Sequence, residues 1–205
     1  IYRNAEWYGS TFWTGPDWTR VGKDWHHPGQ ETPSVRRFQA PRDGRVTVTG
    51  RVHKLHLAGD GVRVSILHGA KELWRAEIDG DDAKGVEPRL TLEVKQGDAL
   101  RFVVHKRGAI SCDTTHWDPV VAYAGGETFQ ASQAFSTKQG NGGWFYEMPA
   151  ASPPPPTVHG LGRDLSLLET SLTAGREFVL TPRDALPFMV IADEADKSGI
   201  ALALD

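Results

Sequence analysis

Side chains able to do acid–base chemistry gather in the segment 108–123, between two stretches with strand-like patterns. Asp113, His116 and Asp118 lie in this run, and His105 precedes it. If these four side chains converged in the fold, they could supply a general acid and a general base. The simpler interpretation is a hydrogen-bonded corner in which Asp113 caps backbone amides and Asp118 turns the chain. We therefore assign no catalytic residue.

Tryptophan is the outlier of the composition, with seven in 205 residues. A sugar ring offers an apolar face that stacks on aromatic rings, and its hydroxyl groups bond to polar side chains at the edge. Tryptophans in loop-like, polar contexts are therefore candidates for ligand stacking, although any of them could equally be a buried anchor. The predicted ligand contacts are Trp13, Trp18, Trp25 and Trp117, with His26 and Asp118 beside them.

Two consecutive arginines, Arg36 and Arg37, occupy a strand-like segment. Successive side chains in a strand point to opposite faces, so only one of the two could face a groove. We name Arg36 as a further ligand-binding candidate, because a uronic acid would be anchored by a bidentate arginine–carboxylate pair. The alternative is a solvated arginine on a strand.

Three carboxylates, Asp79, Asp81 and Asp82, lie in a glycine-flanked loop that could bind a structural calcium ion. The run lacks the glutamate of an EF-hand loop at the twelfth position, where Leu90 stands, and Lys84 would oppose a cation. A solvated turn is the alternative. We expect no other cofactor, and the single cysteine excludes an internal disulfide.

The sequence predicts that the elements that position these residues are β-strands. Valines alternate with polar residues at 46, 48 and 52, and again at 62 and 64, and 22 glycines and 13 prolines indicate many turns. Several short strands separated by turns are typical of an all-β fold, and we predict an antiparallel β-sandwich of the jelly-roll type.

Four prolines at 153–156 predict a stiff connector. We expect a β-sandwich module over 1–152, the proline linker over 153–156, and additional strands over 157–205 that either complete the sandwich or begin a following domain. The chain opens on Ile1 and stops within an alternating run, which suggests a processed chain or a fragment. It shows no signal peptide and no long apolar run. A net charge of −3 gives no reason to expect a nucleic acid or membrane partner.

Five short segments carry a resemblance to a known type of protein: Gly59–Val62, Val94–Asp98, Arg101–Val104, Cys112–Pro119 and Phe135–Trp144. They resemble the β-sandwich accessory modules of large bacterial polysaccharide-degrading proteins. The resemblance covers about residues 20 to 148, and it implies a carbohydrate-binding-module-like jelly roll next to a glycoside hydrolase or polysaccharide lyase, and hence a secreted or periplasmic protein. It carries no binding role onto particular residues.

The function predicted from these observations is non-catalytic. A carbohydrate-binding module would hold a polysaccharide or oligosaccharide near a covalently linked catalytic domain. Two alternatives remain open at this stage: a hydrolase or lyase with a site around His105–Asp118, and a structural module whose aromatic residues pack against a partner domain.

Overall fold

The computed structural model describes residues 2–9, 11–149, 159–160 and 190–191. The chain separates into two compact units, 1–150 and 151–205, and each is considered by itself. Strands account for nearly all regular structure in the first unit, with two 3-10 turns, η1 (Pro16–Trp18) and η2 (Asn141–Gly143). Among the described residues, no helix is long and apolar enough to cross a membrane.

The first sheet contains six strands, all paired antiparallel with their neighbours. In its strand 62–68 the buried side chains of Val62 and Val64 face the core, and the exposed Arg63 between them points to the other face, the pattern of a sheet with one face on a core. In spatial order the strands are β1 (Tyr2–Asn4), β16 (Trp144–Pro149), β6 (Ser34–Gln39), β12 (Ala99–Lys106), β9 (Val62–His68) and β10 (Lys71–Ile78).

Two further antiparallel sheets are connected by short links between consecutive strands of the chain. Strand β7 is followed after two residues by β8, and β13 after two residues by β14, so the same stretches of chain supply both sheets. The second sheet has the order β11 (Leu90–Val94), β7 (Gly44–Thr49), β14 (Val120–Tyr123) and β15 (Thr128–Gln130). The third has the order β2 (Glu6–Tyr8), β3 (Phe12–Thr14), β4 (Arg20–Val21), β5 (Trp25–His27), β13 (Thr115–Trp117) and β8 (Val52–Lys54).

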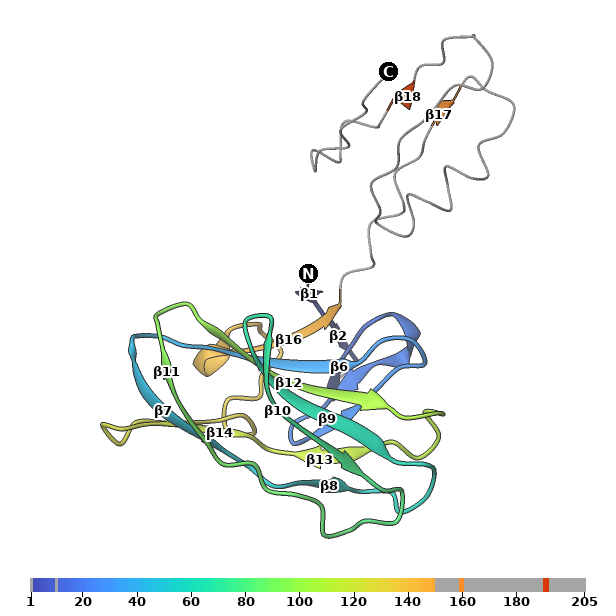
Figure 1. The fold of residues 1–205 in the computed structure, drawn as a ribbon, viewed down its shortest axis with the longest axis horizontal. Helices are drawn as coiled ribbons and strands as arrows, with labels where there is room; N and C mark the ends of the chain where they lie inside the picture. The colour runs from blue at the N-terminus through green and yellow to red at the C-terminus, as the bar shows by residue number, and fades with distance from the viewer. Residues whose placement is uncertain (1, 10, 150–158, 161–189, 192–205) are drawn as a thin grey trace, which may run out of the picture. The chain divides into compact units, whose positions relative to one another are not determined.

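The main core lies between two layers of strands. Phe102 and Ile66 come from the first sheet, Val48 from the second and Trp117 from the third, and all four belong to one buried cluster. The Trp117 ring meets Phe102 edge-on at a centroid distance of 5.4 Å. Figure 1 shows β6, β12 and β9 in one layer and β7, β14, β13 and β8 in the other. The prediction of an all-β antiparallel sandwich is confirmed, whereas its jelly-roll connectivity stays a prediction.

A smaller apolar cluster joins the start of the chain to β16. Trp13 and Val21 of the third sheet pack with Tyr146 and Met148 of the first, and the rings of Trp13 and Tyr146 stack at 5.2 Å. This cluster fixes the inner face of the β2–β3 hairpin to the sandwich. The side chains on its outer face are therefore held in place by a packed inner face.

The second unit is described at only two short strands, β17 (His159–Gly160) and β18 (Val190–Ile191), which pair antiparallel. The predicted proline connector at 153–156 and the rest of the strands predicted over 157–205 lie outside the described residues.

Candidate functional site

The β2–β3 hairpin divides its aromatic residues between two faces. Trp7 lies opposite Trp13, and Tyr8 lies opposite Phe12, so each pair shares one face of the hairpin. Trp7 and Trp13 belong to the smaller apolar cluster. Tyr8 and Phe12 stack at a centroid distance of 5.2 Å on the other face, and Tyr8 is 57 % exposed. The hairpin thus displays two stacked rings to solvent.

The turn that follows β3 presents a third aromatic ring. Asp17 and Trp18 both have left-handed backbone conformations, with φ of 66° and 62°, which cost about 1–2 kcal/mol each for residues with a Cβ. The Asp17 carboxylate offsets this cost, because it accepts hydrogen bonds from the backbone N–H groups of Glu31 and Thr32, the latter at 3.0 Å. Non-glycine residues held in such conformations cluster at binding and catalytic sites. Trp18, at 66 % exposure, has the most exposed large apolar side chain of the described residues.

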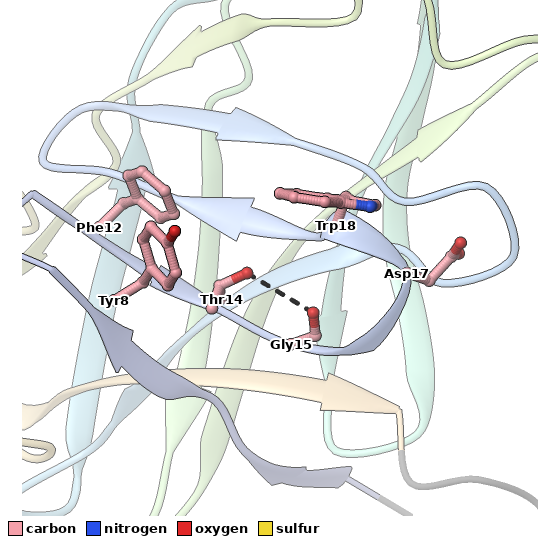
Figure 2. Close-up of a pocket in the computed structure, with 6 residues that line it drawn as sticks. All are labelled: Tyr8, Phe12, Thr14, Gly15, Asp17 and Trp18. Carbon is pink, nitrogen blue, oxygen red and sulfur yellow. Dashed lines mark hydrogen bonds between the residues drawn. The ribbon is translucent and has the colours of Figure 1, made fainter.

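These rings border a cleft of about 260 Å³, shown in Figure 2. The stacked rings of Tyr8 and Phe12 lie at one end and Trp18 at the other, with Thr14 between them, while the Asp17 carboxylate points away from the rings. The Thr14 hydroxyl donates to the Thr19 carbonyl at 2.9 Å, which ties β3 to the far side of the turn. The cleft therefore has an apolar, aromatic lining with a few polar groups around it.

A cation and a further ring extend this surface. The Arg20 guanidinium lies 5.0 Å from the Trp18 ring and 5.5 Å from the Phe12 ring, within the range of attractive cation–π contacts. Trp25 meets Phe12 edge-on at 5.9 Å, and its ring lies against Gly22, where a Cβ would come within 2.1 Å of the indole. We call Tyr8, Phe12, Trp18, Arg20 and Trp25 the aromatic face.

Two of the four tryptophans predicted to contact a ligand belong to the aromatic face, namely Trp18 and Trp25. The prediction needs correction for the other two. Trp117 is completely buried in the main core, and Trp13 is buried with its indole N–H donating to the Ser136 carbonyl at 3.0 Å. Neither ring has a free surface on which a sugar could stack.

His26 and Arg36 are also fully buried, which corrects their prediction as surface ligand contacts. The His26 ring is 3.1 Å from the Ser34 hydroxyl, and burial, followed by the nearby Arg36 cation, holds its pKa well below 6.5. Arg36 donates to the carbonyls of Gly22 and Lys23 at 2.6 and 3.1 Å, and to that of Trp117 at 3.4 Å. Arg36 therefore fixes the turn beneath Trp25 to the core, which is a supporting role.

The Asp118 carboxylate accepts three hydrogen bonds from within the fold. It accepts from the Ser132 backbone N–H at 2.8 Å, from the Ser132 hydroxyl at 2.7 Å and from the Gln130 amide at 2.6 Å. These bonds tie the β13–β14 corner to the segment after β15. This agrees with the simpler interpretation for Asp118, whereas the Asp113 carboxylate pairs with Lys54 and does not cap backbone amides.

The other residues of the acid–base hypothesis have separate partners. Asp113 is fully buried in an ion pair with Lys54, 3.2 Å between Nζ and Oδ1, and burial raises the pKa of its carboxyl group. His116 stacks on His53 at 4.8 Å in the third sheet, whereas His105 belongs to β12 of the first sheet. This placement offers no shared acid–base site.

The loop with three carboxylates does not fit a calcium ion. Asp79 pairs with Arg107 at 2.6 Å, and Asp82 accepts from the backbone N–H groups of Lys84 and Gly85, both at 2.8 Å. Within the described part of the chain, no group of three or more His, Cys, Asp or Glu side chains is placed to hold a metal ion. The carboxylates of Asp79 and Asp82 stabilise the loop directly.

Sequence reasoning did not select Tyr8, Phe12 and Arg20 as site residues. The signal that could have identified the first two is the alternation along the hairpin. Once Trp13 is placed in the core, its neighbour Phe12 must point outward, and Tyr8, opposite Phe12, must do the same. Arg20 follows from the same logic, because it lies opposite Thr14 and next to the buried Val21.

Comparisons with models of known protein families, with curated protein sequences and with solved structures find no match for this chain. The site must therefore be interpreted from its own chemistry.

Proposed function

We propose that this chain is a non-catalytic carbohydrate-binding domain that uses the aromatic face to hold a polysaccharide. The single observation that carries the proposal is the cleft of about 260 Å³ between the stacked Tyr8 and Phe12 rings and the Trp18 ring. Neighbouring exposed rings that form one apolar surface indicate an interaction site more strongly than a single exposed ring, and rings that flank a cleft suit the flat apolar faces of sugars.

The polar groups around the cleft could form hydrogen bonds with the hydroxyl groups of a sugar. The Arg20 guanidinium lies over the Phe12 and Trp18 rings and can donate hydrogen bonds to the hydroxyl groups of a sugar. The Tyr8 hydroxyl can both donate and accept such bonds. The turn that carries Trp18 is held by the Asp17 carboxylate before any ligand arrives. A pre-formed site of this kind loses little conformational freedom on binding. A secreted or periplasmic location, and linkage to a catalytic domain, belong to the same proposal.

The test is binding of the full chain to a panel of soluble polysaccharides by affinity gel electrophoresis, followed by calorimetry with each polymer that retards the protein. Trp18→Ala is expected to weaken binding at least tenfold, equivalent to about 1.4 kcal/mol, because it removes one wall of the cleft. The matched control is Leu57→Ala, which trims another exposed apolar side chain outside the cleft and should leave binding unchanged.

Unretarded migration of the wild-type chain on every polymer would reject the proposal. Equal affinity of wild type and Trp18→Ala would also reject it. Tight association of the aromatic face with a neighbouring protein domain would instead favour the structural-module alternative.

A further inference from the structure

A second pocket, of about 160 Å³, lies on the other side of the segment that Asp17 holds in place. Its walls are the backbone segment 29–33 and the ends of two adjacent strands of the first sheet, β9 and β12. The lining is mostly polar, unlike that of the aromatic cleft. We call it the basic pocket, after its cationic side chains Arg63, Lys106 and Arg107. His105 also lines it, and burial, followed by the nearby Arg63 cation, lowers the pKa of its imidazole, which is therefore mainly neutral near pH 7.

The cations of the basic pocket differ in how far they are already neutralised. Arg107 is paired with Asp79 at 2.6 Å and with Glu77 at 3.5 Å, so its charge is satisfied within the fold. Among the described residues, the one ion-pair partner of Lys106 is Glu31, at a long distance of 3.7 Å, and the Glu31 side chain is 80 % exposed. A pair this long and this exposed contributes little and can exchange for another anion.

Arg63 is the most available of these cations. Its side chain is exposed, and no carboxylate of the described residues lies within ion-pair distance of its guanidinium. Arg63 lies directly opposite His105 in the β9–β12 pair, so the two share one face of the sheet. An exposed guanidinium beside an imidazole and a loosely paired ammonium matches the oxygens of a carboxylate or a sulfate group.

The basic pocket and the aromatic cleft share a structural element. Asp17 lines the cleft, and its carboxylate accepts from the backbone N–H groups of Glu31 and Thr32, which line the basic pocket. Gly29 approaches Asp17 so closely that a Cβ there would lie 2.3 Å from the Asp17 carbonyl oxygen. The two pockets therefore sit on either side of one tightly packed turn, close enough for one polysaccharide chain to reach both.

We propose that the ligand of the aromatic face is an acidic polysaccharide, and that the basic pocket binds the carboxylate or sulfate group of one of its sugar units. A water molecule takes about 30 Å³ in the liquid, so the pocket has room for such a group and part of the ring that carries it. This inference rests on the proposed function and adds the class of polysaccharide to it. With a net charge of −3, the chain as a whole does not attract polyanions, so the local group of cations must select the acidic ligand.

The experiment compares binding of the full chain to polygalacturonate, a sulfated galactan and an uncharged galactan at two salt concentrations. The variants are Arg63→Gln and Lys106→Gln, and the matched control is Arg45→Gln. Arg45 is an exposed arginine in β7, paired with Glu93. The expected result is tighter binding to at least one acidic polymer than to the uncharged one. Arg63→Gln should weaken that binding about tenfold and Lys106→Gln about threefold, while Arg45→Gln leaves it unchanged.

The two acidic polymers distinguish a carboxylate-binding pocket from a sulfate-binding one. Equal affinity of wild type and Arg63→Gln for the acidic polymers would overturn the inference, and so would tighter binding to the uncharged galactan. In either case, Trp18-dependent binding to any polymer leaves the proposed function standing. Binding to polyglutamate as tight as to the acidic polysaccharides, and insensitive to Trp18→Ala, would overturn both proposals as non-specific polyanion attraction.

Discussion

Trp117 and Trp18 are the same residue type in opposite surroundings. Trp117 is the last residue of β13, where its ring is completely buried between two sheets, while Trp18 lies in a left-handed turn with 66 % of its surface exposed. The main core that surrounds Trp117 draws residues from three sheets, whereas the aromatic face depends on short strands and one turn at the start of the chain.

The contrast shows that the role of an aromatic residue in this protein depends on which face of its strand or turn it occupies. In the sandwich, a strand residue whose neighbours point outward is buried and stabilises the fold. On the hairpin, the alternate residues point away from the smaller apolar cluster and remain available. Removing rings from the two regions should therefore affect different properties, stability in one and binding in the other.

The largest expected effect comes from the core. Trp117→Ala should lower the free energy of unfolding by about 3–5 kcal/mol, because the ring contacts Phe102 and Trp74 and its removal leaves a cavity that the two sheets cannot close. Urea denaturation followed by circular dichroism measures the loss. Leu57→Ala, at an exposed position, is the control and should change stability by less than about 0.5 kcal/mol. A similarly small loss for Trp117→Ala would contradict its place in the core.

The next effect tests the connection between the two regions. Arg36→Met should cost about 3 kcal/mol, because three carbonyl groups, two of them in fully buried hydrogen bonds, lose a charged donor. It should also weaken polysaccharide binding, since Gly22 and Lys23 form the turn beneath Trp25. Unfolding and binding are measured on the same preparation, with Arg45→Met as the control at an exposed arginine. Unchanged stability in Arg36→Met would show that the buried guanidinium is dispensable.

A smaller effect is expected from the turn that presents Trp18. Gly29→Ala should reduce stability by about 2 kcal/mol, because the added methyl group meets the Asp17 backbone and forces the two segments apart. The displaced turn should reduce binding even though residue 29 is not part of the cleft. Calorimetry and thermal unfolding give the two values. Gly125→Ala is the matched control, because Gly125, like Gly29, has no positive φ, but an added Cβ there meets nothing within 4 Å.

The smallest expected effect is a pH dependence of the free energy of unfolding, caused by the buried His26. Burial holds the pKa of His26 well below its usual 6.5, so below about pH 6.5 the unfolded chain takes up a proton that the native protein does not bind. The stabilisation is complete above that pH and is lost as the pH falls, by at most about 1.4 kcal/mol for each pH unit. His26→Leu should flatten the slope measured between pH 7.5 and 5.5. A wild-type protein equally stable across this range would disprove the assignment.

Much of the fold could be predicted from the sequence. The alternating valines at 46 and 48, and at 62 and 64, correspond to β7 and β9, with these side chains buried in the main core. This worked because period-2 alternation is a local signal that directly reports which face is buried.

The candidate site could be predicted only in part. Loop-like context correctly favoured exposure of Trp18, but it could not place Trp13 and Trp117, since their burial depends on partners far away in sequence such as Tyr146 and Phe102. Arg36 illustrates the same limit. It lies opposite Phe102 on the core side of the first sheet, and the carbonyl groups that make burial of its charge tolerable come from a turn 13 and 14 residues earlier.

The left-handed backbone at Asp17 and Trp18 has a kinetic consequence. The turn is fixed by a carboxylate that bonds to a segment 14 and 15 residues away, so under the proposed function the indole is already oriented before a sugar binds. Encounter should then be limited by diffusion and orientation, with no slow rearrangement beforehand. Variants that loosen the turn should consequently slow association as well as hasten release, whereas variants that only shorten a ring should change the release rate alone.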